Sequence, residues 1–131
     1  MHEMMKLSTL QDVLANPGAV GKLIAELNPL MQEYESLQEV KGSSIPIRVD
    51  ADAEFELSLR DVDTLCSLFV ADQVTQSQLA YIADSIDLSE GVSYDGSPIA
   101  DFIGEMTDPE INGVFTKDRA EEIRKEICIQ P

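Results

Sequence analysis

The spacing of apolar side chains is helical at the start of this chain. The segment Ser8–Gln11 has the pattern of a capping box, and the residues after it continue an apolar face to Leu14. Asn16-Pro17 ends this short helix and suits the cap and first position of the next one. We expect the second helix to begin near Val20, to be kinked or restarted at Asn28-Pro29, and to continue to about Val40.

The apolar period then changes from near four to two. Ile45, Ile47 and Val49 alternate with other residues, and the alternation resumes from Ala53 to Leu57. The segment Asp50–Asp52 separates the two runs and has the composition of a turn. These features predict one β-hairpin at residues 45–57, packed on the helices, with Pro46 confining its first strand to an edge.

From Ser58 onward the pattern is helical again, in four short segments. Capping patterns stand at Ser58–Asp61, Thr75–Gln78, Ser97-Pro98 and Thr116. The sequence therefore predicts a mainly α protein with a small β-hairpin (α+β), forming a single compact helical domain of six or so short helices over residues 1–131. Asn112-Gly113 has the composition of a turn between the last two helices. The core residues we expect are Leu23, Leu27, Leu65, Phe69, Leu79, Ile82, Phe102, Ile103 and Ile123.

The composition and the apolar runs of the chain predict a cytoplasmic protein. Hydrophobic residues make up 44% of the chain, a normal share for a globular domain. No apolar run is long enough to span a bilayer, and the first residues do not form a signal-peptide core. We expect no membrane association.

The residues needed for much of enzyme chemistry are missing. His2 is the sole histidine and stands at the very start of the chain, which argues against Ser-His and Cys-His pairs. Cys66 and Cys128 both fall in apolar helical patterns, so we expect buried thiols instead of a disulfide or a zinc site. The prediction is a non-enzymatic protein with no catalytic residues, no metal and no cofactor. An enzyme that uses carboxylates alone, with Mg²⁺, is a third and weaker alternative to the two binding functions described below.

Charge is the most distinctive property of the sequence. Nine basic and twenty-five acidic residues give a formal net charge of −16. Eleven carboxylates lie between Asp61 and Thr116 with no lysine or arginine among them. Such a field attracts a cationic partner and repels nucleic acids and anionic membranes. An acidic surface that serves solubility alone would have the same composition.

Two groups of acidic residues are the candidate partner-binding site. The first lies on the expected hairpin and the start of the helix after it, where alternation turns Glu54 and Glu56 to solvent. The second surrounds the end of the helix that begins near Leu79. The ten residues are Asp50, Asp52, Glu54, Glu56, Asp61 and Asp63 in the first group, and Asp84, Asp87, Glu90 and Asp95 in the second.

The C-terminal third of the chain resembles a known family. The segments that carry the resemblance are Leu79–Asp84, Leu88–Glu90 and Glu105–Gly113, followed by Thr116. They are similar to the C-terminal part of small bacterial immunity proteins, which are paired with the nuclease-type tips of contact-dependent growth inhibition and related polymorphic toxins. Residues 1–60 match no family.

The resemblance implies inhibition by binding. It predicts a cytoplasmic immunity protein that neutralises a cognate basic toxin domain of the nuclease type, with no direct contact to nucleic acid. The acidity agrees with this, because nucleases present basic surfaces to phosphates. The alternative is an acidic adaptor or nucleic-acid-mimic inhibitor of a basic DNA- or RNA-binding protein, to which the same surface would be suited.

Overall fold

The computed structural model of the chain describes residues 4–38, 49–107 and 115–129. Short strands and helices alternate at its N-terminal end: β1 (Met5–Lys6), α1 (Leu7–Ala15), the 3-10 turn η1 (Pro17–Ala19), α2 (Val20–Gln38), β2 (Val49–Asp50) and β3 (Phe55–Leu57). Helices dominate the remainder: α3 (Leu59–Val70), α4 (Gln76–Leu88), β4 (Val92–Tyr94), α5 (Ser97–Met106) and α7 (Lys117–Ile129). The predicted mainly α fold with a small β part is confirmed.

Local capping chemistry sets the start of most helices. Ser58 and Thr75 each form the predicted capping box, with Asp61 and Gln78 at the third helical position. Asn16 accepts a hydrogen bond from the Gly18 amide and so opens η1. Thr116 Oγ1 accepts one from the Arg119 amide at 3.1 Å, as a cap of α7 should.

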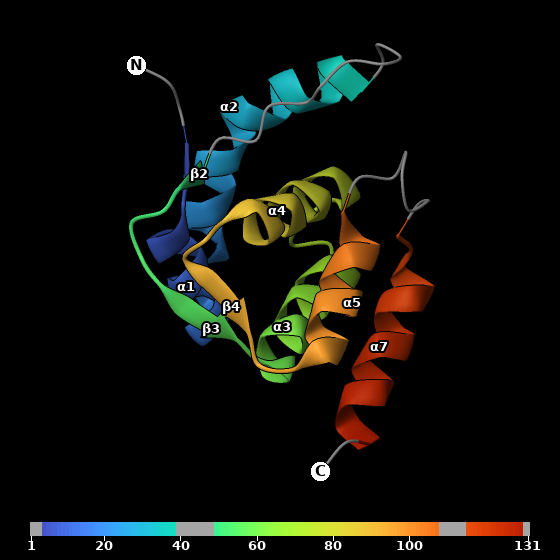
Figure 1. The fold of residues 1–131 in the computed structure, drawn as a ribbon. Helices are drawn as coiled ribbons and strands as arrows, with labels where there is room; N and C mark the ends of the chain where they lie inside the picture. The colour runs from blue at the N-terminus through green and yellow to red at the C-terminus, as the bar shows by residue number, and fades with distance from the viewer. Residues whose placement is uncertain (1–3, 39–48, 108–114, 130–131) are drawn as a thin grey trace.

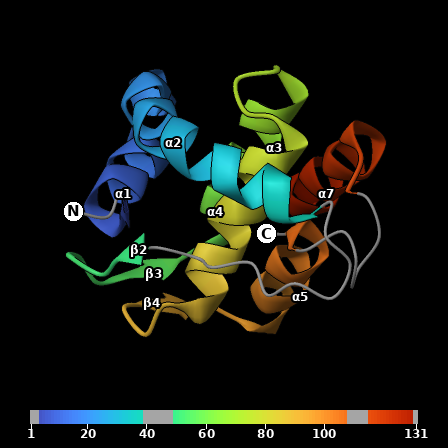
Figure 2. The same ribbon diagram turned by 90° about the horizontal axis from the view of Figure 1, so that it is seen from above.

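Two predicted caps are wrong. Helix α5 begins at Ser97, and its cap is Gly96 at a φ of 115°, a backbone region that glycine tolerates best. Helix α1 begins at Leu7, so Ser8 lies inside it and donates its hydroxyl to Asp52 Oδ2 at 2.6 Å. Of the kink or restart predicted at Asn28-Pro29, the restart is wrong, since α2 continues through Pro29. Figure 2 shows this helix bent along its length.

The predicted β-hairpin is also wrong. Residues 55–57 do form a strand, but β3 pairs in parallel with β4, and β2 pairs in parallel with β1. The segment Asp50–Asp52 does not reverse the chain, because it runs past the N-terminus of α1, where Asp52 accepts hydrogen bonds from Ser8. Residues 45–48 of the expected first strand and the expected turn at Asn112-Gly113 lie outside the described residues.

One cluster of buried side chains runs from Met5 in β1 to Ile123 in α7. All nine side chains predicted for the core are buried in it. The buried hydroxyls also have partners: Ser85 donates to the Tyr81 carbonyl and Ser89 to the Ser85 carbonyl. Figures 1 and 2 show β3 and β4 on one side of the helices and α7 on the opposite side.

Candidate partner-binding surface

The two predicted acidic groups meet at the parallel pair β3–β4. Glu56 in β3 stands opposite Ser93 in β4. The Phe55 amide donates to the Gly91 carbonyl at 2.9 Å, so the chain around Glu90 runs beside the chain around Glu54. A group of residues that is split in the sequence is therefore brought together across the strands.

Five of the predicted acidic residues are exposed around these strands. Glu54 and Glu56 are exposed to solvent, whereas Leu57 of β3 is fully buried in the core. This is the alternation that the sequence predicted. Tyr94 donates its hydroxyl to Asp87 Oδ1 at 3.3 Å, which ties the end of α4 to β4. We call the five residues the β3–β4 acidic surface: Glu54, Glu56, Asp87, Glu90 and Asp95.

Three other predicted acidic residues serve the fold. Asp52 accepts hydrogen bonds from the amide and the hydroxyl of Ser8. The pKa of Asp52 is lowered, and the bond from the Ser8 hydroxyl is the main cause. Asp61 Oδ2 accepts from the amide and hydroxyl of Ser58 in the capping box. Asp63 Oδ1 lies 3.0 Å from Arg124 Nε of α7.

The remaining two predicted acidic residues, Asp50 and Asp84, do not belong to the β3–β4 acidic surface. Asp50 is partly buried in β2, where it pairs with Lys6 of β1 in the strand register. Asp84 is partly buried on α4 and takes part in an interaction of its own. Neither has the open exposure of the five residues around β3 and β4.

Helix α7 supplies counter-charges to the other side of the molecule. Arg119 holds Glu105 of α5 with two hydrogen bonds, Nε to Oε1 at 2.7 Å and Nη2 to Oε2 at 2.8 Å. The pKa of Arg119 is raised, mainly by these bonds to Glu105. The pKa of Arg124 is raised in the same way by its hydrogen bond to Asp63. Lys117 pairs with Asp72 after α3. The acidic residues near α7 are thus partly neutralised by it.

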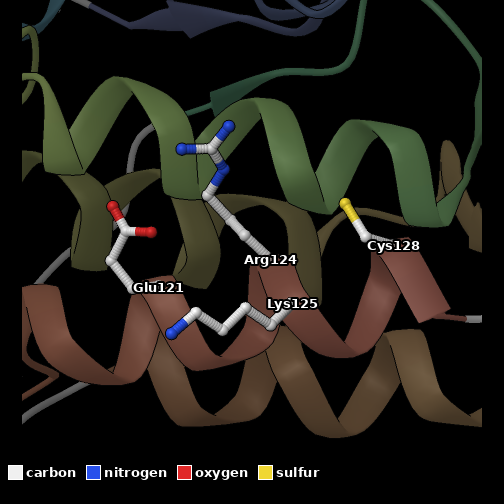
Figure 3. A pocket seen from close by; sticks show the side chains of 4 residues that line it. All are labelled: Glu121, Arg124, Lys125 and Cys128. Atoms are coloured by element: carbon white, nitrogen blue, oxygen red, sulfur yellow. The ribbon is translucent and has the colours of Figure 1, made fainter.

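A shallow, mainly apolar hollow of about 490 Å³ lies along α7. Figure 3 shows its lining residues on this single helix: Glu121, Arg124, Lys125 and Cys128. Cys128 is an exposed free thiol, so the expectation that both cysteines are buried is wrong for this one. Cys66 is buried and free, and its burial raises its pKa to about 12.

A smaller hollow of about 190 Å³ adjoins the β3–β4 acidic surface. We call it the α1–β3 notch, and its lining residues are Gln11, Leu14, Ala15, Phe55, Glu56 and Asp61. Sequence reasoning identified Glu56 and Asp61 but missed Gln11 and Ala15. Those two belong to the polar face of a short amphipathic helix, and no sequence signal shows what such a face adjoins.

Within the residues that the structure describes, no three His, Cys, Asp or Glu side chains converge as metal ligands would. No helix in the described ranges has the length and apolar character needed to cross a membrane.

Comparison of the chain with protein-family models, curated proteins and solved structures found no match.

Proposed function

We propose that this protein is a non-enzymatic, cytoplasmic immunity protein that binds and neutralises a basic toxin domain of the nuclease type through its β3–β4 acidic surface. Two considerations support the proposal. The C-terminal third of the sequence resembles immunity proteins of polymorphic toxin systems, and the surface gathers five exposed carboxylates. Docking of this surface would set it against the basic residues that a nuclease uses to hold phosphates.

The uneven distribution of counter-charges is the observation that carries the proposal. On the α7 side, Asp63, Asp72 and Glu105 are each paired with a base of α7. Glu54, Glu90 and Asp95 on the opposite side have no such ion pair among the described residues. Fixed like charges without internal partners raise the local field and so favour association with a cation-rich surface.

The test uses the protein encoded directly upstream as the toxin, because immunity genes adjoin their toxin genes if the resemblance holds. Association rates are measured from low to high salt, together with survival of cells that express both proteins. One variant replaces four residues of the surface: Glu54→Gln, Glu56→Gln, Glu90→Gln and Asp95→Asn. At low salt it should associate about tenfold more slowly, with a flatter salt dependence, and protect cells less.

A matched variant removes the same charge from other faces. It carries Asp12→Asn on α1, Asp101→Asn on α5, and Asp118→Asn with Glu121→Gln on α7. This control should associate and protect nearly as the parent does. Equal behaviour of the two variants would leave the β3–β4 acidic surface as a solubility feature. Absence of any binding to the upstream protein would overturn the immunity function itself.

A further inference from the structure

The α1–β3 notch lies where three elements meet. The last turns of α1 contribute Gln11, Leu14 and Ala15; β3 contributes Phe55 and Glu56; and the first turn of α3 contributes Asp61. Glu56 belongs both to the notch and to the β3–β4 acidic surface. Whatever occupies the notch would therefore be continuous with a partner bound to that surface.

The lining combines apolar and anionic side chains. Leu14, Ala15 and Phe55 offer carbon surface, whereas Glu56 is an exposed carboxylate. Asp61 is the second carboxylate of the lining, and its Oδ2 already accepts two hydrogen bonds from Ser58. Among the described residues, no basic side chain lines the notch. An apolar stem that ends in a cation matches this combination, as in arginine and lysine.

The backbone adds to the same preference. Helix α1 ends at Ala15, and the carbonyl end of a helix carries a partial negative charge that favours cations. This helix has no basic residue in its last turn to satisfy that end. A cation in the notch would thus be attracted by two side-chain carboxylates and by the C-terminus of α1, while Asp61 offsets the partial positive charge at the N-terminus of α3.

Size limits the occupant to a single side chain. Pockets for small molecules begin at roughly 300 Å³, and the notch measures about 190 Å³. Arginine suits it better than lysine because its planar guanidinium can pair two oxygens at once and stack on an aromatic ring such as that of Phe55. Buried arginines are also common among the residues that dominate protein interfaces.

We propose that the α1–β3 notch receives one arginine side chain of a basic protein partner. The identity of that partner as a toxin rests on the function proposed above, whereas the preference of the notch for arginine does not. The guanidinium pairs with Glu56 and Asp61 and stacks on Phe55, and its methylene stem lies against Leu14.

The first test titrates the full-length ¹⁵N-labelled protein with N-acetyl-L-arginine amide. Amide shifts should change at Gln11, Ala15 and Glu56 and saturate together. The neutral probe N-acetyl-L-citrulline amide, which has the same shape without the charge, should leave them unchanged. Shift changes that are scattered over all acidic faces, or equal for both probes, would overturn the proposal.

Three variants divide charge from space. Glu56→Gln removes the exposed carboxylate and should weaken binding of the arginine probe about threefold to tenfold. Ala15→Phe should fill the notch with no change of charge and abolish the shifts. Glu54→Gln removes one charge from a residue that lies two positions before Glu56 and outside the notch, and should have little effect. Circular dichroism and thermal melting establish whether each variant is folded. If Ala15→Phe does not fold, Glu56→Gln still provides the test, because it changes an exposed side chain.

A second arm repeats the variants with the upstream-encoded protein. If the arginine probe binds in the notch and that protein does not bind, the notch stands and the toxin-inhibitor function fails. If the protein binds but Glu56→Gln weakens it no more than Glu54→Gln, and the probe causes no localised shifts, the arginine site fails and the proposed function stands.

Discussion

At the scale of single residues, carboxylates that look alike in the sequence have different roles. Asp52 replaces a missing local cap at the N-terminus of α1, accepting the Ser8 amide at 2.8 Å. Glu26 of α2 assists it by accepting the Lys6 amide at 3.0 Å and the Thr9 hydroxyl. Asp61 closes a capping box within four residues of sequence, and for this reason its role was predictable. The role of Asp52 was not, because its partner lies 44 residues away.

Replacing Asp52 with Asn should make the stability of the protein less sensitive to acid. The pKa of Asp52 is lowered in the folded state from its ordinary value of 3.8, so its contribution is present above that value and lost as pH falls through the folded pKa. Near neutral pH the variant should be less stable by about 0.5 to 1 kcal/mol, since Asp52 is exposed. Urea unfolding from pH 7 down to pH 3 measures the difference, which should shrink as the parent becomes protonated. A difference independent of pH would contradict this, and Asp50→Asn is the control.

At the scale of elements, the helices were predictable and the strand pairing was not. Helix starts depend on side chains within a few residues, so Ser58, Thr75 and Thr116 could be identified from the sequence. Alternation identified residues 55–57 as a strand but carried no information about its partner. The neighbour of β3 is β4, which follows an entire pair of helices, and only tertiary packing sets such a parallel pairing. All five members of the acidic surface could therefore be predicted from the sequence, but not that its two groups adjoin.

Replacing Gly91 with Ala should destabilise the β3–β4 pair. A Cβ at this position would lie 2.8 Å from the Ala53 carbonyl oxygen, a backbone atom that cannot move aside without shifting the strand. We expect a loss of about 1 to 3 kcal/mol in the free energy of unfolding, measured with urea. Gly21→Ala is the matched control, because nothing lies within 4 Å of its added Cβ. At this exposed position of helix α2 the change should stabilise by about 0.5 to 1 kcal/mol. Equal effects of the two substitutions would contradict the close approach at Gly91.

At the scale of the whole molecule, the net charge of −16 opposes folding while the bases of α7 favour it. The composition alone predicted the excess of negative charge, but not that α7 would neutralise only one side. Repulsion among exposed charges acts over distances that salt screens, since the Debye length falls from about 30 Å at 0.01 M to about 3 Å at 1 M. The Arg119–Glu105 bonds, at 2.7 and 2.8 Å and partly buried, are screened less.

The melting temperature should therefore rise as NaCl is increased from 0.01 M to 0.5 M, because screening relieves more repulsion than attraction. Differential scanning calorimetry measures it. The variant with four neutralised residues on the β3–β4 acidic surface should melt with a smaller dependence on salt than the parent. A melting temperature that falls with added salt would mean that the ion pairs of α7 outweigh the repulsion.

The distant capping of α1 has a consequence for the order in which the chain folds during synthesis. A helix of nine residues without a cap of its own is unstable in isolation. One of its two capping carboxylates, Asp52, leaves the ribosome 44 residues after Ser8. The ribosome adds roughly 5 to 20 residues per second, and domains fold as units as the chain emerges. The first helix in the sequence is thus expected to be among the later ones to become stable, because its capping is complete only after the segment that carries Asp52 has been translated.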